Sequence, residues 1–565
     1  MTESTAPIAE NAPTSTAARI GWAGLILVTL YVCYFSHLGA IGFVGPDEPR
    51  YAWIARDMAE TGDWVTPRLY GKPWFEKPPL FYWGAALSFK LFGVSEVAAR
   101  LPSAISALLA TLALAWLALC LYGAEAARWL LLLLPTTVGM IGFSHAAATD
   151  MPFSAMLTIA MVSAAVVLGL TRNENTPILP RTPWLALLLF GFFLGLAVLA
   201  KGPAAIVLSG GAVFFWALFT KRWRDAFRLL HPAAIASFCL TALPWYVLCA
   251  RRNPDFFRIF IIEHNFQRYL TPEFQHIQPF WFYLPVQLAA FLPWTGILVW
   301  TAVAGAVRYA KSRMLSPHTA FLLCWSLFAI LFFTLSKSKL PGYILPAVPA
   351  LALLLAWSCR KLAIEHNRSF GASIAGFAFL CLVISVLAAK LFPNAALPSQ
   401  QVKLALSFAF GMVSMANTIL AAAFLCGRSR SEINLVSLVC VVPVLFLFVI
   451  AGKPIAGVYS LSAKDLAAQL YSSNVPPEQT SVYHGMGRSL RYGLNFYLRR
   501  EVPDWDQNPH ADVYVVSGSY NCERLVRQGF ACVDVPLGTT TSGWFVSHVT
   551  PRKSADGPHD RRQPH

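Results

Sequence analysis

Residues 20–42 read IGWAGLILVTLYVCYFSHLGAIG, and the charged stretch Pro46-Asp47-Glu48-Pro49-Arg50-Tyr51 follows almost at once. An apolar run of this length can cross the roughly 30 Å hydrocarbon core of a membrane. Charged side chains beside hydrocarbon are costly unless they are paired or reach water, so a cluster of them at the end of a span predicts a functional site. A second charged stretch, Phe75-Glu76-Lys77-Pro78-Pro79-Leu80, lies further along the same loop.

Apolar runs of this kind recur along most of the chain. The 565 residues are 56% hydrophobic and 13% charged, with a mean hydropathy of +0.54, which excludes an ordinary soluble domain. We therefore predict a polytopic α-helical membrane protein with about thirteen transmembrane helices. The predicted spans are residues 20–42, 97–122, 129–143, 153–171, 184–200, 204–220, 229–250, 280–307, 318–335, 341–358, 369–391, 404–425 and 433–452. A shorter apolar stretch, 80–92, carries Lys90 and is predicted to be an interfacial or re-entrant helix.

The basic residues of the short loops predict the orientation in the membrane. With the N-terminus in the cytoplasm, the inside loops carry clusters such as Lys221, Arg222, Arg224 and Arg228, whereas the outer loops mix both signs. The charged stretches after the first span then face outward, away from the cytoplasm. The formal net charge of +16 is explained by these loops and by contacts with membrane lipids, so we expect no nucleic-acid partner.

The composition changes after residue 452. Residues 1–452 form the predicted transmembrane domain, with long periplasmic loops at 43–96 and 251–279. Residues 453–550 predict a small α/β periplasmic domain, with strands at 480–484, 511–517 and 544–549 and helices at 487–500 and 522–528. The tail, residues 551–565, is charged and is predicted to be disordered.

Two local patterns add detail. In the first loop a helical pattern continues from Arg50 and places Tyr51, Ile54 and Met58 on one face. In the C-terminal segment Cys522 and Cys532 could form a disulfide in an oxidising compartment.

The carboxylates and the lysine of the first loop are candidates for chemistry. Asp47 or Glu48 could act as a general base or hold an acceptor group, although two solvated acids at a helix N-terminus are the alternative. Glu76 and Lys77 precede a double proline that fixes the backbone. A lysine in this position suits a phosphate group, and a snorkelling lysine with a salt-bridge partner is the alternative.

Shorter outer loops repeat the mixture of acids and bases. Asp150 stands at the end of a span, Lys201 lies in a tight turn, and Tyr343 follows a Ser/Lys-rich loop. In the second long loop, His264 and Arg268 share a helical face by their four-residue spacing.

This set of side chains suits a lipid-linked phosphosugar. Cations and a tyrosine hydroxyl can stabilise a phosphate as it leaves, and a carboxylate can prepare the acceptor. Glu76 and His264 could in addition hold a divalent metal, Zn or Mg.

The chain resembles a known family, the undecaprenyl-phosphate 4-amino-4-deoxy-L-arabinose transferases, which modify lipid A and are related to the protein O-mannosyltransferases. The resemblance covers most of the predicted membrane domain. It rests on Asp47-Glu48-Pro49-Arg50-Tyr51-Ala52, Gly62-Asp63-Trp64-Val65-Thr66-Pro67-Arg68, Phe75-Glu76-Lys77-Pro78-Pro79-Leu80, Thr149-Asp150, Lys201-Gly202-Pro203, Glu263-His264 and Ser338-Lys339-Leu340-Pro341-Gly342-Tyr343.

The resemblance implies an inverting glycosyltransferase of the GT-C type with thirteen spans and a periplasmic C-terminal domain. It also implies roles for the residues that match. Asp47 is the implied catalytic carboxylate, with Asp150 and Lys201 as further catalytic residues near the sugar or acceptor. Lys77, Arg268 and Tyr343 bind the donor phosphate, and Glu76 and His264 hold a metal. Arg50, Tyr51 and Glu48 are implied to bind the substrate, with Arg50 and Tyr51 shaping the pocket.

The expected reaction moves a sugar, 4-amino-4-deoxy-L-arabinose, from undecaprenyl phosphate to lipid A. Two other readings stay open. One keeps the lipid-linked donor and changes the acceptor to a protein hydroxyl or a cell-envelope polysaccharide. The other is a transporter of a lipid-linked glycan, which predicts charges in the middle of spans and matched broken helices, and neither pattern is evident in the sequence.

Overall fold

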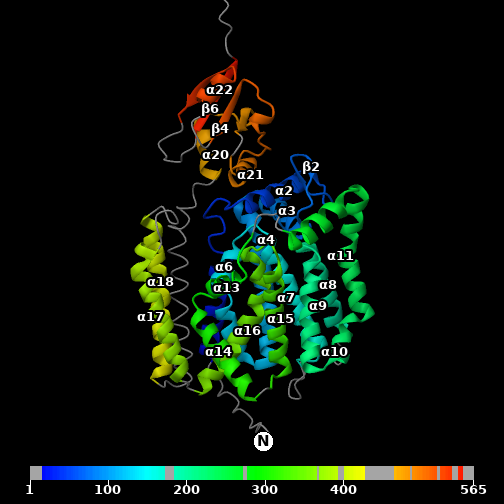
Figure 1. Ribbon diagram of the computed structural model, residues 1–565, viewed down its shortest axis with the longest axis vertical. Helices are drawn as coiled ribbons and strands as arrows, with labels where there is room; N and C mark the ends of the chain where they lie inside the picture. The colour runs from blue at the N-terminus through cyan, green and yellow to red at the C-terminus, as the bar shows by residue number, and fades with distance from the viewer. Residues whose placement is uncertain are drawn as a thin grey trace, which may run out of the picture. The chain divides into compact units, whose positions relative to one another are not determined.

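The computed structural model describes residues 16–171, 184–271, 277–312, 314–365, 368–391, 400–426, 463–483, 486–517, 522–536 and 545–551 (Figure 1). The predicted span 433–452, the boundary near residue 452 and the tail from residue 552 lie outside these residues. The chain forms two compact units. The helical unit is Met1–Leu38, Trp74–Gly84 and Arg100–Ile455, and the sheet unit is Gly39–Pro73, Ala85–Ala99 and Ala456–His565.

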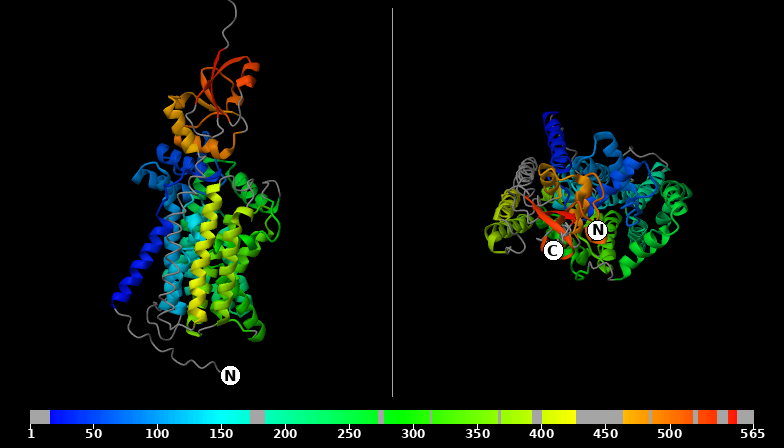
Figure 2. Two further views of the ribbon diagram at one scale, coloured as in Figure 1. Left: turned by 90° about the vertical axis from the view of Figure 1, so that its left-hand side faces the viewer. Right: turned by 90° about the horizontal axis from the view of Figure 1, so that it is seen from above.

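The helical unit is a bundle whose helices run roughly side by side (Figures 1 and 2). The unit boundary crosses two helices, α3 (Leu80–Phe92) and α4 (Glu96–Tyr122). The helices that lie wholly within the unit are α1 (Thr16–Tyr34), α5 (Ala124–Leu133), α6 (Val138–Ser144), α7 (Asp150–Val167), α8 (Trp184–Lys201), α9 (Ala204–Thr220), α10 (Trp223–Phe227), η1 (Arg228–Leu230), α11 (Pro232–Arg252), η2 (Arg258–Gln267), α12 (Arg268–Leu270), α13 (Tyr283–Ala290), α14 (Thr295–Ser312), α15 (Pro317–Leu335), η3 (Pro341–Ala347), α16 (Val348–Glu365), α17 (Arg368–Leu391) and α18 (Gln400–Leu425).

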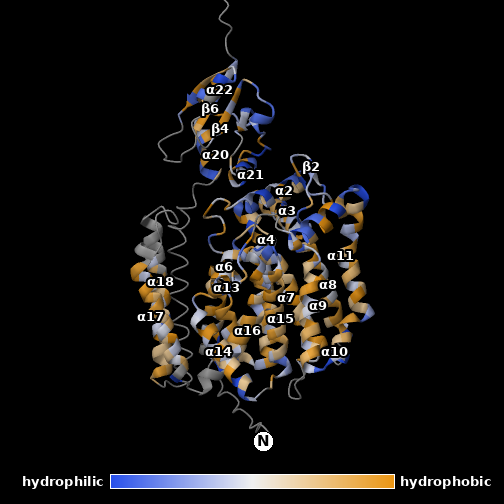
Figure 3. Ribbon diagram, in the orientation of Figure 1, coloured by the Kyte–Doolittle hydropathy of each residue, from blue (hydrophilic) through white to orange (hydrophobic). Residues whose placement is uncertain are grey.

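Seven of the described helices are long and apolar enough to cross a membrane, and the number rises to nine if each of two bent pairs is one span. Apolar residues cover these helices along most of their length (Figure 3). The prediction of a polytopic helical membrane protein is therefore confirmed. The number thirteen stays a prediction, because one predicted span lies outside the described residues and others form shorter apolar helices such as Ala204–Thr220.

Two predicted spans are not single straight helices. The stretch predicted as one span at 129–143 consists of α5 and α6, which meet at 63°, and the one at 280–307 consists of α13 and α14, which meet at 119°. Pro135 and Pro293 stand at the two breaks. A proline has no amide hydrogen to donate and clashes with the preceding turn, so it ends a helix that hydropathy alone would continue.

The sheet unit contains a four-stranded sheet in the order β3-β4-β6-β5, where the strands are β3 (Thr480–Val482), β4 (Val513–Ser517), β5 (Phe530–Val535) and β6 (Phe545–Pro551). β3 and β4 are parallel, and the other pairs are antiparallel. The sheet is accompanied by α20 (Ala463–Ser472), η4 (Pro477–Gln479), α21 (Arg488–Tyr497), η5 (Trp505–Gln507) and α22 (Cys522–Arg527). The three predicted strands and both predicted helices are confirmed, whereas β5 and α20 were not predicted.

Alternate residues of the central strands face two separate cores, as the two-residue period of a strand requires. Val516 and Val546 pack with Leu466 and Leu494 of α20 and α21. Val515 and Val549 pack instead with Trp505 and Leu525. A disulfide joins Cys522 to Cys532 and links α22 to the edge strand β5.

The same unit includes most of the first loop. Helix α2 (Asp47–Thr61) has Asp47 and Glu48 in its first turn, where the helix dipole favours acids, and ends at Gly62, whose φ of 74° is the left-handed conformation of a C-cap. Tyr51, Ile54 and Met58 are buried, so the predicted helical face is confirmed. A short hairpin, β1 (Arg68–Leu69) with β2 (Lys72–Pro73), follows.

Candidate active site

Glu76 and Lys77 lie at the start of α3, where Pro78 and Pro79 fix the backbone. The Arg268 guanidinium donates a hydrogen bond from Nη1 to Oε1 of Glu76 at 3.2 Å, and the Lys77 ammonium lies 3.9 Å from the same oxygen. All three side chains are largely buried. One carboxylate therefore faces two cations, and this leaves an excess of positive charge in a site shielded from water.

Burial and, next, the nearby Arg268 guanidinium lower the pKa of Lys77, Glu76 acts in the opposite direction, and the net pKa is about 7. An ammonium with a pKa this close to neutral is poised to gain or lose its proton. A bound anion would favour the protonated, charged form of Lys77, so the site is suited to binding an anion.

Asp150 and Lys201 meet between two neighbouring helices. Asp150 begins α7 and Lys201 ends α8, and Nζ of Lys201 donates a hydrogen bond to Oδ1 of Asp150 at 2.5 Å. The same ammonium lies 4.5 Å from the ring centroid of Tyr343. Lys77 and Arg268 are close enough to act electrostatically on Asp150. The structure therefore brings Glu76, Lys77, Asp150, Lys201, Arg268 and Tyr343 into one cluster, and their roles stay predictions.

Two glycines allow the backbone to approach this cluster. Gly202 has a φ of 95°, which lets the chain turn directly after Lys201. Gly342 lies against the carboxylate of Asp150, since a Cβ placed on it would come within 2.6 Å of Oδ1. Both glycines stand next to predicted site residues in the sequence.

His264 lies in a π-helical segment, η2, and α12 begins at Arg268. Burial lowers the pKa of His264, and Glu76 acts on the imidazole in the opposite direction. His264 is therefore in the same cluster. The Glu76 carboxylate already faces Lys77 and Arg268, and two cations next to a carboxylate oppose the addition of a metal cation. Among the described residues, the group of three or more potential metal ligands is Cys522, Cys532 and Asp534, and the two sulfurs are bonded to each other.

The remaining predicted site residues belong to the sheet unit and lie in the first turn of α2. Arg50 is buried and donates from Nη2 to Oδ1 of Asp47 at 2.6 Å, and its guanidinium lies 5.0 Å from the centroid of the Tyr51 ring. The side chain of Asp47 is 52% exposed, so one face of its carboxylate is open to solvent. Glu48 is buried and accepts a hydrogen bond from the amide of Val44, a contact that fixes the entry into the helix.

Residues of the C-terminal segment hold this helix, and the sequence did not predict them. Ser489 donates to the carbonyl of Gly45 at 2.8 Å, and Tyr492 lies 5.9 Å from the Arg50 guanidinium. Further along α2, Trp53 donates from Nε1 to Glu501 at 3.0 Å. These partners are separated by more than four hundred positions in the chain, so no local pattern reveals them.

The sequence profile of the family described as "Dolichyl-phosphate-mannose-protein mannosyltransferase" matches residues 22–260. Among curated proteins, the chain is 36% identical over 349 residues to the undecaprenyl phosphate-alpha-4-amino-4-deoxy-L-arabinose arabinosyl transferase of Aeromonas salmonicida, which is 61% of this chain and 62% of that protein. It is also 36% identical over 373 residues to transferase 2 of the same name from Sodalis glossinidius, with 64% of each chain covered. The chain thus matches about three fifths of the length of these relatives.

Two solved structures are similar in fold over a larger share of this chain than the curated relatives are in sequence. The fold superimposes on crystal structures of ArnT from Cupriavidus metallidurans bound to undecaprenyl phosphate, with a TM-score of 0.76, 24% identity and coverage of 95% of this chain and 99% of that one. For the apo state the TM-score is 0.75, with 25% identity and coverage of 94% and 98%.

The multi-span bundle, the charged cluster at the helix ends and this likeness define a membrane protein with the GT-C glycosyltransferase fold. Within that class, the chain is similar in sequence to the undecaprenyl phosphate-aminoarabinose arabinosyl transferases over about three fifths of its length.

Proposed function

We propose that this protein is a polyprenyl-phosphate-sugar-dependent glycosyltransferase that moves 4-amino-4-deoxy-L-arabinose from undecaprenyl phosphate to lipid A. The observation that carries the proposal is the buried cluster in which Lys77, Arg268 and Lys201 outnumber Glu76 and Asp150. A buried excess of positive charge suits a phosphate group. The names of the similar proteins supply the chemistry of the donor, and lipid A as the acceptor is carried over from the resemblance of the sequence motifs.

In the proposed reaction, an oxygen of the acceptor attacks the anomeric carbon of the sugar, and the bond from that carbon to the donor phosphate oxygen breaks. The electron pair leaves with undecaprenyl phosphate, whose charge Lys77, Arg268 and the Tyr343 hydroxyl stabilise. Asp47 takes the acceptor proton or holds the acceptor for attack, which its partly exposed carboxylate allows. Attack from the side opposite the phosphate inverts the anomeric configuration.

The other predicted residues have supporting roles in this proposal. Lys201 keeps Asp150 ionised and directed toward the sugar or acceptor. Arg50, Tyr51 and Glu48 fix the position of Asp47 on α2. A divalent metal held by Glu76 and His264 stays a prediction, and the cations beside Glu76 argue against it.

The proposal is tested with the purified protein, undecaprenyl-phosphate-linked aminoarabinose and lipid A, with the product identified by mass spectrometry. We expect Asp47→Asn to lower the rate by roughly 10²–10⁴-fold, the range for loss of a general base. Glu60→Gln is the matched control, because Glu60 lies on the same helix, pairs with Arg56 at 2.6 Å and is 52% exposed, like Asp47. Full activity of Asp47→Asn would contradict the role of this carboxylate, and a sugar found on protein or polysaccharide instead of lipid A would contradict the acceptor.

We also infer that the N-terminus is cytoplasmic, that about thirteen spans cross the inner membrane and that the segment after residue 452 is periplasmic. The disulfide between Cys522 and Cys532 supports this orientation, because disulfides persist in the oxidising periplasm and not in the cytosol. Whole cells are treated with a thiol reagent that does not cross the inner membrane. Residues 522 and 532 should be modified only after reduction. Absence of modification after reduction would contradict the periplasmic position, and modification without reduction would contradict the disulfide.

A further inference from the structure

A cavity lies between α8, α9, α10 and α11, and on α9 its lining extends from Ile206 to Phe214. It has a volume of about 330 Å³, and its walls are almost entirely apolar; they include Phe190, Leu194, Val213, Phe214, Leu230 and Phe238. This volume is at the lower end of the range of about 300–1,000 Å³ for pockets that hold small molecules. An apolar cavity that opens on the outside of a membrane bundle suits an alkyl chain.

The rim of this cavity is basic. The segment 221–230 contains Lys221, Arg222, Arg224 and Arg228 and a single acid, Asp225. Asp225 lies 2.7 Å from Arg222 and 2.9 Å from Arg228, so one carboxylate is shared by two guanidinium groups. Lys221, Arg224 and Arg228 are exposed, and positive charge therefore remains for an external anion.

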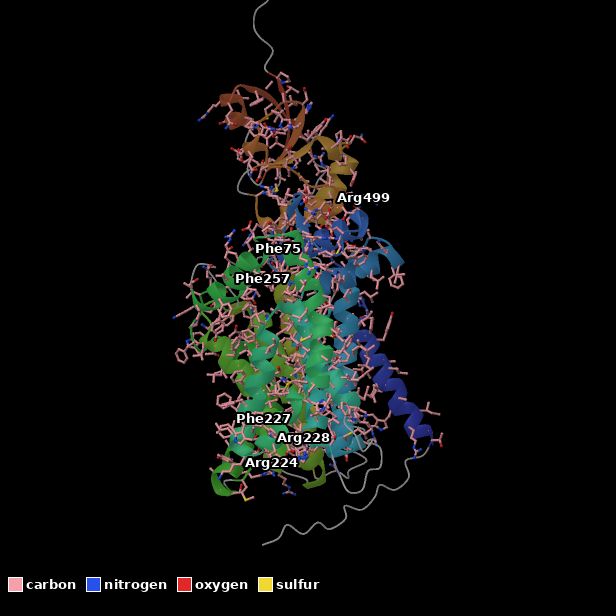
Figure 4. The ribbon with its side chains drawn as sticks, turned by 90° about the vertical axis from the view of Figure 1, so that its right-hand side faces the viewer. Phe75, Arg224, Phe227, Arg228, Phe257 and Arg499 are labelled. Carbon is pink, nitrogen blue, oxygen red and sulfur yellow. A yellow bond between two sulfur atoms is a disulfide. The ribbon has the colours of Figure 1, made fainter. Side chains whose placement is uncertain are left out.

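Apolar side chains of the same segment join the rim to the cavity. Trp223, Phe227 and Leu230 line the cavity and yet are exposed, with Phe227 at 64%. Phe227 lies with Arg224 and Arg228 at one end of the bundle (Figure 4). Tryptophan and basic residues together are typical of the boundary between hydrocarbon and lipid headgroups.

We propose that an anionic glycerophospholipid of the surrounding membrane binds here, with one acyl chain in the cavity and its phosphate beside Lys221, Arg224 and Arg228. The charge of the rim selects an anionic headgroup over a zwitterionic one, because each basic residue at a membrane surface attracts anionic lipid. The site is separate from the charged cluster of Lys77 and Lys201. The basic rim and Lys201 lie beyond opposite ends of α9, whose seventeen residues extend over about 25 Å at 1.5 Å per residue.

The place of the basic rim argues against the polyprenyl donor as the occupant. The rim follows the end of α9 that is opposite Lys201, whereas the proposed phosphate site for the donor contains Lys77 and Arg268. The inference therefore does not depend on the proposed function.

The test measures retention of phosphatidylglycerol and phosphatidylcholine by the purified protein, by native mass spectrometry over a lipid titration. The headgroup variant is Arg224→Gln with Arg228→Gln. The variant that tests binding of the acyl chain is Gly210→Leu. Gly210 lines the cavity, and a side chain can be added there because a Cβ on it would meet nothing within 4 Å. The matched control is Arg308→Gln with Lys311→Gln, which removes the same charge from exposed positions near the end of α14.

We expect the wild type to retain phosphatidylglycerol in preference to phosphatidylcholine. The headgroup variant should bind phosphatidylglycerol about 25-fold more weakly, at about fivefold for each charge removed, and the control should bind like the wild type. Gly210→Leu should weaken binding of both lipids. Equal retention of the two lipids, an unchanged headgroup variant, an equal loss in the control, or displacement of phosphatidylglycerol by an equal amount of undecaprenyl phosphate would each overturn the inference.

Discussion

Lys201 and Asp150 form a buried ion pair at 2.5 Å although they lie on different helices and 51 positions apart in the chain. The pair closes one side of the cation-rich cluster. Each charge offsets part of the free-energy cost of removing the other from water. The pair therefore holds the start of α7 and the end of α8 together, and it also affects the chemistry that Asp150 can perform.

Removal of one partner should therefore be more harmful than removal of both. We expect Lys201→Met to destabilise the helical unit by about 1–3 kcal/mol, since the Asp150 carboxylate loses its hydrogen-bond donor and keeps only the more distant Lys77 and Arg268 as cations. The double variant Asp150→Asn with Lys201→Met should recover part of this loss. Thermal unfolding of the four proteins in detergent, analysed as a double-mutant cycle, measures the coupling, and strictly additive effects would contradict it.

Donor binding should depend on the protonation of Lys77. Because the pKa of Lys77 in the free protein is about 7 and its ordinary value is 10.5, the folded chain binds fewer protons than the unfolded chain between these values, and stability rises with pH in that window. The phosphodiester of the donor keeps its single charge over the same range and favours charged Lys77. We therefore expect KM for the donor to rise as the pH increases above about 7, with a smaller effect on kcat.

Lys77→Arg gives a direct comparison for this pH dependence. An arginine stays protonated, so the pH profile of KM above 7 should become flat even if the variant binds less well at pH 6. An unchanged profile in Lys77→Arg would assign the titration to another group.

Gly342 should not accept a side chain. Its Cβ would come within 2.6 Å of Oδ1 of Asp150 and 2.9 Å of the Phe143 ring, so Gly342→Ala should displace the carboxylate. Shifts of about 1 Å in a reacting group can lower a rate by roughly 100-fold. Gly142→Ala is the control, since a Cβ on Gly142 would meet nothing within 4 Å. Equal rates for both variants and the wild type would contradict the close approach.

Glu501 should be required for the position of α2. It accepts hydrogen bonds from Nε1 of Trp53 and from the amide of Tyr70, and Glu501→Ala leaves both donors without this partner at a cost of about 1–3 kcal/mol. We expect faster proteolysis within residues 47–73 and a lower kcat. Glu523→Ala, which removes a highly exposed acid of α22, should change neither, and equal protection of residues 47–73 in the two variants would contradict the prediction.

The sequence predicted those parts of the fold that depend on local patterns. The apolar runs located most of the long helices, the spacing of Tyr51, Ile54 and Met58 located the buried face of α2, and alternation located three strands. It failed where a single residue overrides the pattern, as Pro135 and Pro293 do. It also failed at β5, an edge strand whose mixed exposure gives no clean alternation.

The candidate site, like the fold, could be predicted from the sequence only in part. Charges such as Lys77 and Asp150 were found because they are unusual beside apolar spans, and the structure brings them together. Their pairing could not be predicted, because charge type alone does not decide whether Glu76 faces Arg268 or a metal. Tyr492 and Glu501 look like ordinary residues of a small α/β segment, and only the folded chain reveals their contacts with α2.

The sheet unit is assembled from chain segments that are made far apart in time. Trp53 leaves the ribosome 448 residues before Glu501, an interval of roughly 20–90 seconds at about 5–20 residues per second. Throughout that interval the first loop has none of its C-terminal partners. A chain whose synthesis stops early therefore lacks the residues that contact α2, the helix that carries Asp47, so the sheet unit can be completed only when residues 456–565 have been translated.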